Sequence, residues 1–430
     1  MVDFRPFRAL RYHESNAGDL SALICPPYDV ISEQEQSDLY SINSYNSVRL
    51  ELPLQSSKTP QKKYADVKFS INKWIKDNIL VRDSKESFYI TRHQFVFSDT
   101  LYTRHGITGC IRLTTSPNDA LIRHEHTSPE PEHDRLLHVQ NSHTNISPIM
   151  GLYSDSESVL TNLVKQVTEN KPVSQATLSN KEQILLWKTD KPEHLQLIQT
   201  KMLERKVHLA DGHHRYGAMQ QYQEMTEGMP NFSGPNAESN FIMITLIPFN
   251  DPGLLLLPYH RMLPNLPEDI IRSIDRKIAD YFEEISVIPV HNTSIKASIK
   301  TIDALLQLTT DNMLVQVRKD SLTLLKPRTN MKPPSEPRNE AVITSLSWIL
   351  TEQVLKPVLA SRYDETLRYE HQVTPILTAI QNQSVQTGFI VTPLSLDTFE
   401  LLEQANTILP PKSTFFHPKL PAGLTIRELN

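Results

Sequence analysis

Residues 207–219 read Val-His-Leu-Ala-Asp-Gly-His-His-Arg-Tyr-Gly-Ala-Met, and this stretch decides the local fold. Val207–Ala210 is short and apolar, as expected of a buried strand. Asp211 is a residue type that commonly caps helices, and Gly212 allows the backbone to turn sharply. We therefore predict a strand, a tight turn capped by Asp211, and a helix that runs to about Tyr222.

The first turn of this predicted helix holds His213, His214 and Arg215. A helix N-terminus presents N–H groups that have no acceptor within the helix, together with the positive end of the helix dipole. Acidic side chains are usual at this position, so three cationic or cationisable ones favour a site for an anion such as phosphate. The alternative is a plain strand-to-helix turn with a solvated histidine pair.

The composition indicates a globular protein with a small net charge. Of 430 residues, 39% are hydrophobic and 22% charged, with a formal net charge of −5, which argues against a nucleic-acid partner. Cys25 and Cys110 do not form a disulfide framework, which favours a reducing cytoplasm. Apolar runs such as Phe241–Phe249 are too short to span a bilayer, so we expect no membrane partner.

Strand and helix patterns divide the chain into three parts. Residues 1–262 are predicted to form an α+β core that contains the strand–helix motif, and residues 263–360 a helical and hairpin accessory lobe. This lobe holds few candidate catalytic residues, which suits packing or homodimerisation. Residues 361–430 are predicted to form an α/β segment that returns to the core.

Periodicity predicts the individual elements. Helices are expected at 62–78, 156–167, 194–204, 267–284, 342–355, 375–383 and 397–406. Strands are expected at 47–52, 87–97, 102–113, 182–188, 241–248, 313–317, 321–325, 367–371 and 388–393, with 87–97 and 102–113 paired as a hairpin. Long loops are expected at 24–32, 123–135, 251–261 and 326–338, and long structured loops are often functional.

Arg123–His143 is a second concentration of reactive side chains, with five of the chain's 16 histidines. No standard zinc spacing occurs there, so Mg²⁺ shared between a carboxylate and substrate phosphates is the better expectation. Glu125 is the first candidate for a general base, with His124 beside it as a further catalytic candidate. A surface salt bridge between Glu125 and Arg123 is the alternative.

Two further segments carry candidate site residues. Pro26 and Pro27 stiffen a loop that projects Asp29, either as a catalytic carboxylate or as the cap of a helix starting near Glu33. Lys412-Ser413-Thr414 combines a lysine with two hydroxyls, as phosphate sites often do, although no Walker or Rossmann fingerprint is present.

Ordered motifs over nearly the whole chain resemble the bacterial and archaeal family catalogued as domain of unknown function 1015. They are Pro6–Tyr12, Pro26–Ile31, Arg123-His124-Glu125 with Thr127, Asp134-Arg135, Asp211–Arg215, Asp251–Leu254, His260-Arg261, and Pro411–Phe416 through Pro418-Lys419. Three positions depart from the family pattern: Ser44, His126 and Gln372. The family name by itself implies no reaction.

Asp211-Gly212-His213-His214-Arg215 also resembles the phosphate-binding box of the ParB/sulfiredoxin-like superfamily, which includes free-serine kinases. This second resemblance implies a mixed-sheet core of that type, with an additional α/β lobe. Genes of the first family often lie beside serine-biosynthesis genes. Together the resemblances imply phosphoryl transfer that involves serine or phosphoserine.

The expected function is therefore a phosphotransferase or phosphatase for a small hydroxy amino acid, dependent on Mg²⁺ and on ATP or ADP. The turn at Asp211–Arg215 and the Lys412–Thr414 segment would hold phosphates. Glu125 or Asp29 would act as base or orient the metal, and Lys412 and Arg135 would neutralise the transferring group. The alternative is a ParB-like nucleotide-binding regulatory protein.

Overall fold

The computed structural model describes residues 1–54, 63–114, 121–123, 129–230, 232–290, 293–307, 312–328, 345–396, 398–400 and 412–429. These residues form two compact units. Unit 1 takes the described residues of 1–123, 127–255 and 418–430, and unit 2 takes those of 256–417. Both units mix helices and strands, which confirms the predicted α+β class. The predicted boundaries at 262 and 360 stay predictions.

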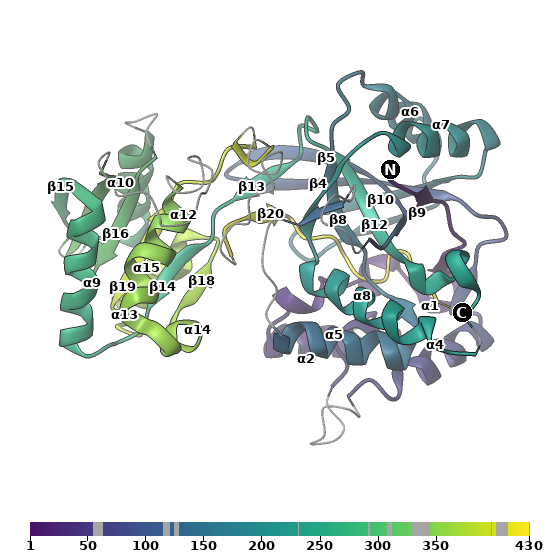
Figure 1. Cartoon of the computed structure of the whole chain (residues 1–430), viewed down its shortest axis with the longest axis horizontal. Helices are drawn as coiled ribbons and strands as arrows, with labels where there is room; N and C mark the ends of the chain where they lie inside the picture. The colour runs from purple at the N-terminus through teal and green to yellow at the C-terminus, as the bar shows by residue number, and fades with distance from the viewer. Residues whose placement is uncertain are drawn as a thin grey trace. The chain divides into compact units, whose positions relative to one another are not determined.

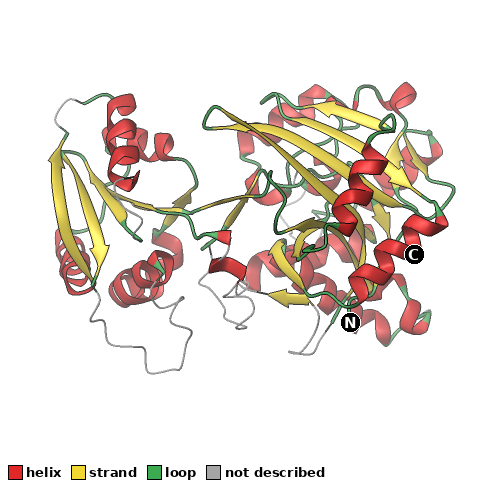
Figure 2. Cartoon of the chain, turned by 90° about the horizontal axis from the view of Figure 1, so that it is seen from above, coloured by secondary structure: helices red, strands yellow, loops and turns green. Residues whose placement is uncertain are grey.

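Unit 1 is built on a mixed nine-stranded sheet in the order β6-β11-β8-β12-β5-β4-β10-β9, with β1 paired to β5. Its strands are β1 (Phe4–Arg5), β4 (Phe88–Phe97), β5 (Thr100–Arg112), β6 (Leu121–Arg123), β8 (Ile149–Tyr153), β9 (Ser174–Thr177), β10 (Gln183–Thr189), β11 (Val207–Asp211) and β12 (Phe241–Pro248). The pairs β11–β6 and β12–β8 are parallel, and the other pairs are antiparallel. Figures 1 and 2 show this sheet with helices around it.

The predicted hairpin is confirmed as β4 and β5. Phe97 pairs with Thr100, and the two residues between them, Ser98 and Asp99, have φ of 47° and 61°. Positive φ at both central residues is the requirement of a two-residue type I′ turn, whose twist matches that of the strands. The hairpin supplies the centre of the sheet, so its register fixes which side chains face each core.

Alternation along the strands gives the sheet two buried faces. One face packs against helices α6 (Val159–Thr168) and α7 (Pro192–Leu203), and its members include Phe88, Ile90, Ile242 and Ile244. The other face packs against α4 (Val67–Lys76) and the C-terminal residues, and its members include Tyr89, Ile184, Met243 and Ile426. A sheet that is buried on both faces explains why its strands read as near-continuous apolar runs.

The remaining elements of unit 1 lie outside the large sheet. They are β2 (Leu10–Tyr12), α1 (Glu14–Ala17), η1 (Leu20–Ala22), η2 (Tyr28–Val30), α2 (Glu33–Ile42), α3 (Val48–Glu51), β3 (Leu80–Arg82), α5 (Pro129–Ser142), β7 (Thr144–Asn145), α8 (His213–Glu227), η4 (Gly234–Asn236), η5 (Glu238–Asn240) and β21 (Arg427–Glu428). Helices α5 and α8 run side by side (Figure 1), close enough that a Cβ on Gly217 would lie 2.3 Å from a Glu132 carboxylate oxygen.

Two predictions in this unit are wrong. The strand expected at 47–52 is the short helix α3, because the Asn46 side chain accepts a hydrogen bond from the Val48 amide (2.9 Å) and starts a turn. The loop expected at 123–135 becomes helical at Pro129, the first residue of α5. Proline suits a first helical position, and Glu130 and Glu132 complement the helix dipole there.

The C-terminal residues of the chain thread through unit 1. Ala422 pairs with Cys25, Gly423 donates to the Ile146 carbonyl (3.0 Å), and Ile426 pairs with Leu10. Strand β21 then pairs with β7. These contacts join positions separated by hundreds of residues, so the segment after residue 417 is an integral part of this core.

Unit 2 contains a six-stranded sheet in the order β15-β17-β16-β19-β14-β18. Its strands are β14 (His260–Leu263), β15 (Phe282–Pro289), β16 (Leu314–Arg318), β17 (Ser321–Pro327), β18 (Arg368–Glu370) and β19 (Thr387–Val391), and the pair β13 (Leu255–Leu257) and β20 (Phe415–His417) forms a separate ribbon. Its helices are α9 (Glu268–Tyr281), α10 (Ile295–Gln307), α12 (Leu346–Trp348), the π-helix η6 (Ile349–Leu355), α13 (Lys356–Leu359), η7 (Ala360–Arg362), α14 (Tyr363–Thr366) and α15 (Val373–Gln381).

The predicted hairpin of unit 2 is confirmed by the pairing of β16 with β17. The predicted helix at 267–284 is also present, although it ends at Tyr281 because β15 begins at Phe282. The predicted loop at 251–261 contains β13 and the start of β14. Most of the helix expected at 397–406 and of the loop expected at 326–338 lies outside the described residues. Among the described helices, none is long and apolar enough to cross a membrane.

Candidate functional site

The predicted strand–turn–helix is confirmed as β11, Gly212 and α8. Gly212 has φ of +91°, and a Cβ there would lie 2.5 Å from Ile149 Cγ2, so both backbone and space require glycine. The prediction that Asp211 caps the helix is wrong. The N-cap is Gly212, which has no side-chain cap, and Asp211 is the last residue of β11.

The Asp211 carboxylate instead forms two buried ion pairs. Arg215 Nη2 lies 2.8 Å from Asp211 Oδ2, and Lys419 Nζ contacts Oδ1. All three side chains are about nine-tenths buried. Burial by itself raises the pKa of Asp211, but Lys419 and Arg215 outweigh it and lower that pKa to about 2. The first turn of α8 is therefore a region of positive potential.

Arg215 is held in place from its other side. Its Nη1 donates to Ser147 Oγ (2.9 Å) and to the Pro148 carbonyl (2.7 Å). The Ser147 hydroxyl donates in turn to Glu51 Oε1 (2.9 Å), which also accepts from the Tyr28 amide (3.3 Å). A continuous polar chain thus links β11, the residues before β8, α3 and the loop of Tyr28. Such a chain fixes the direction of the guanidinium.

Arg135 lies at the same cluster, on α5. Its Nη2 donates to the Tyr64 hydroxyl (2.5 Å) and to Asp134 Oδ2 (2.5 Å). Its guanidinium carbon lies 3.7 Å from the centroid of the Tyr28 ring. This stacking brings the predicted Pro26–Ile31 loop against α5, a contact that no local sequence pattern shows.

Asp29 is exposed and lies in η2, beside these cations. Burial opposes a charged Lys419, but Asp211 and then Asp29 outweigh burial and raise the pKa of Lys419. The alternative that Asp29 caps the next helix is wrong, because Ser32 caps α2 in a capping box with Glu35. Among the described residues, the Asp29 carboxylate makes no ion pair.

A small polar cavity lies inside this cluster. It measures about 30 Å³ and is lined by residues that include Glu51, Arg135, His138, Ser147 and Arg215. A volume of this size holds one or two water molecules and excludes a substrate. A bound molecule would therefore contact the cluster from its exposed edge, where Asp29 lies.

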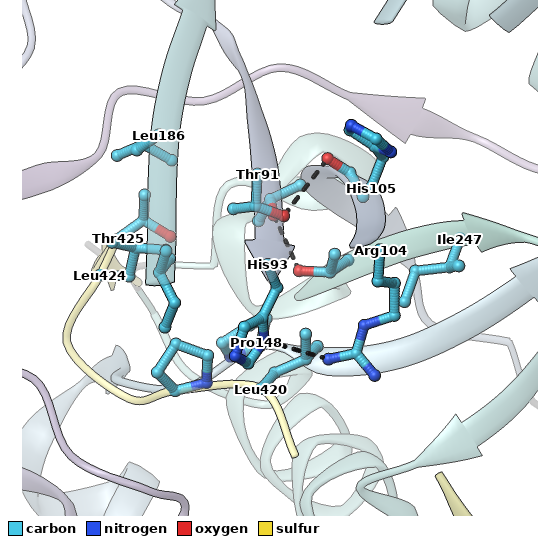
Figure 3. Close-up of a pocket in the computed structure, with 15 residues that line it drawn as sticks. Thr91, His93, Arg104, His105, Pro148, Leu186, Ile247, Leu420, Leu424 and Thr425 are labelled. Atoms are coloured by element: carbon cyan, nitrogen blue, oxygen red, sulfur yellow. Dashed lines mark hydrogen bonds between the residues drawn. The ribbon is translucent and has the colours of Figure 1, made fainter. Parts of the chain in front are cut away.

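A second cavity, of about 20 Å³, is lined by Arg104 and by Leu420 and Pro421, the residues that follow Lys419 in the chain (Figure 3). Arg104, 2% exposed, donates from Nη2 to the Pro418 carbonyl (2.7 Å), directly before Lys419. The same Nη2 of Arg104 lies 3.5 Å from Nδ1 of His93, which also lines the cavity. The Nε2 of His93 lies 2.8 Å from Glu182 Oε2. Burial lowers the pKa of Arg104 to about 10, so it remains charged at neutral pH. Arg104 therefore positions Lys419.

The structure brings together Asp29, Arg135, Asp211, Gly212 and Arg215 among the predicted residues, with His213 and His214 in the same helical turn. Lys412, Ser413 and Thr414 belong to unit 2, where Lys412 Nζ lies 5.1 Å from the centroid of the Tyr259 ring. His124 and Glu125 lie outside the described residues. The roles of all these residues stay predictions.

The sequence reasoning missed Glu51, Ser147 and Lys419. Lys419 stood in a quoted motif, Pro418-Lys419, but received no role. Glu51 lay in a segment wrongly predicted as a strand, and no sequence motif singled out Ser147. Within the described part of the chain, no group of three or more histidine, cysteine, aspartate or glutamate residues could hold a metal ion.

Comparisons with known proteins place the chain in a family. No curated protein matches it. Solved structures with some similarity include a conserved hypothetical protein from Pyrococcus furiosus, at 13% identity and a TM-score of 0.37 over 72% of this chain and 92% of that one. A free serine kinase in complex with AMP matches at 11% identity and a TM-score of 0.39, over 73% and 91%. Similarity this low carries no inference about function. The model of one family matches residues 4–347, and the chain therefore belongs to the family described as protein of unknown function (DUF1015).

Proposed function

We propose that unit 1 carries a phosphoryl-transfer site that adds or removes a phosphoryl group on a small hydroxy amino acid, serine or phosphoserine. The observation that carries this proposal is the turn at Asp211–Arg215, where two buried cations flank one carboxylate at a helix N-terminus. The finer assignment of unit 1 to the ParB/sulfiredoxin-like folds belongs to the same proposal.

The turn has the physical properties of a phosphate site. The first turn of a helix carries the equivalent of about half a positive charge. Arg215 and Lys419 add two charges against the single charge of Asp211. Arg215 Nε is buried and has no acceptor among the described residues, so the guanidinium retains a donor for a ligand. Phosphate is the anion that suits such a turn, because helix N-termini and charge-assisted donors both favour its oxygens.

A carboxylate at the exposed edge of the cluster is the proposed general base. In the proposal, Asp29 accepts the proton of the substrate hydroxyl, or of water when phosphoserine is hydrolysed. Lys419, whose pKa Asp29 helps to raise, lies beside it and neutralises charge on the transferring group. Arg135 holds the loop of Asp29 through its contact with Tyr28. Glu125 remains the second proposed base.

Mg²⁺ suits the donors at this edge. The ion is usually held by one or two carboxylates and by substrate phosphates, and the exposed Asp29 carboxylate is available for that role. When bound, Mg²⁺ would withdraw charge from the phosphoryl oxygens. ATP or ADP is the proposed phosphoryl donor or acceptor.

Phosphorus NMR tests the proposal directly. The protein is incubated with Mg²⁺ and, separately, serine plus ATP, phosphoserine plus ADP, and phosphoserine alone. We expect turnover in at least one mixture. Absence of turnover in all three would exclude this function.

Variants then test the assigned residues. Arg215→Gln and Asp29→Asn should each lower kcat by about 100-fold, the usual effect of losing one electrostatic or acid–base group. Asp29 is exposed, so Asp29→Asn should leave the melting temperature unchanged. The matched control is Arg272→Gln, an arginine 62% exposed on α9. Full activity of Arg215→Gln would show that phosphate binds elsewhere.

A further inference from the structure

A third cavity, larger than the two described above, lies away from the turn at Asp211. It belongs to unit 1 and has a volume of about 400 Å³, the size of a metabolite-binding pocket. Its walls come from β1, the residues after it, β3, β5, α7, η4, η5, β12 and β21. None of the residues assigned above to phosphoryl transfer lines it. We call it the N-terminal pocket.

Charged side chains of both signs line the N-terminal pocket, and most of them form ion pairs. Its charged lining residues are Arg5, Arg8, Arg82, Arg427, Glu86, Glu238 and Glu428. Two of the glutamates are already matched by cations. Glu428 contacts both Arg82 and Lys68, and Glu238 contacts Arg427.

Arg8 is the cation best placed for a ligand. Its side chain is exposed, and its Nε donates to the Asp83 backbone carbonyl (2.9 Å). The nearby Asp83 carboxylate is already occupied by Arg11 (2.8 Å) and Lys188 (2.8 Å). Among the described residues, no carboxylate pairs with Arg8. Its two terminal nitrogens are therefore available to an anionic group, in the fork geometry that suits carboxylate and phosphate.

Another part of the lining is a rigid stack of side chains around Phe241. Phe241 lines the pocket, and the guanidiniums of Arg5 and Arg112 lie 4.4 and 4.5 Å from its ring centroid. Asp3 accepts hydrogen bonds from both arginines, at 2.7 Å from Arg5 and 3.0 Å from Arg112, and so holds the stack rigid. This part of the lining is therefore held in a fixed shape.

We propose that the N-terminal pocket binds a small organic anion, whose carboxylate or phosphate group is held by Arg8. This site is separate from the proposed phosphoryl-transfer site and does not depend on it. The pocket joins the start of the chain to β21 near its end, so an occupant would also hold these two segments together.

Calorimetric titration at low ionic strength tests the proposal with two probes, succinate and glycerol 2-phosphate. We expect saturable binding of at least one, which also shows whether carboxylate or phosphate is preferred. Arg8→Gln should weaken this binding at least tenfold, whereas Arg8→Lys should retain part of it because the charge remains. The matched control Arg272→Gln should bind as the parent protein does.

The variants also separate the two sites. Arg215→Gln should leave probe binding unchanged. If Arg215→Gln abolishes binding and Arg8→Gln does not, the probe sits at the turn of Asp211 and the proposal is wrong. The proposal also fails if neither probe binds saturably. A thermal melt of each variant shows that it is folded, and the bound probe should raise the melting temperature of the parent but not of Arg8→Gln.

Discussion

Replacing Asp211 with asparagine removes the carboxylate that Arg215 and Lys419 share and leaves two buried cations facing each other. Breaking a buried ion pair in this way typically costs about 3–5 kcal/mol. The matched control is Asp190→Asn, also in unit 1. Asp190 pairs with Lys85 at 3.2 Å, but the two side chains are 39% and 72% exposed. Loss of an exposed pair should cost less than about 1 kcal/mol.

Urea unfolding followed by tryptophan fluorescence measures both variants. Trp74 and Trp187 lie in unit 1 and Trp348 in unit 2, so a Trp348→Phe background makes the signal report on unit 1. If Asp211→Asn is no less stable than Asp190→Asn in that background, the ion pairs do not stabilise the turn.

Comparing the parent protein with Asp211→Asn at different pH values gives a second test. The pKa of Asp211 is lowered from 3.8 to about 2 by its cations, so its folded pKa is below its unfolded one. The ionised carboxylate therefore stabilises the fold above pH 4, by about 2 kcal/mol at 1.36 kcal/mol per pKa unit. This advantage over Asp211→Asn should disappear as the pH falls from about 4 to about 2. A stability difference that is constant across this range would contradict the assignment.

Two further substitutions test the surroundings of the turn. Gly212→Ala should destabilise unit 1 by about 1–3 kcal/mol in the same urea assay, because of its positive φ and the contact with Ile149; an unchanged midpoint would show that the turn tolerates a side chain. His138 is buried, with its ring nitrogen 2.8 Å from the Leu50 carbonyl, and burial, aided by Arg135, lowers its pKa to about 4. Its folded pKa is thus below the unfolded value of 6.5, so about 3 kcal/mol of stability should be lost as the pH falls from 6.5 towards 4. The variant His138→Gln should flatten that part of the pH profile, and an unaltered profile would assign the loss to another group.

Sequence patterns predicted the helices, strands and turns that neighbouring residues determine. The hairpin of β4 and β5 follows from alternation and a two-residue turn at Ser98-Asp99. The turn at Gly212 follows from a strand that meets glycine and then a helix. The strand predicted at 47–52 is wrong because the local pattern there is ambiguous. A few alternating residues fit a strand and a short helix equally well.

The partners of each site residue depend on contacts that sequence spacing does not show. The sequence by itself determined that Asp211–Arg215 forms a glycine turn before a helix, because those conformational preferences are local. Only the tertiary structure decided that Asp211 binds cations rather than capping the helix. Lys419 reaches it from 208 residues away, held by Arg104 through Pro418. Burial makes that ion pair strong, and burial is a property of the folded chain.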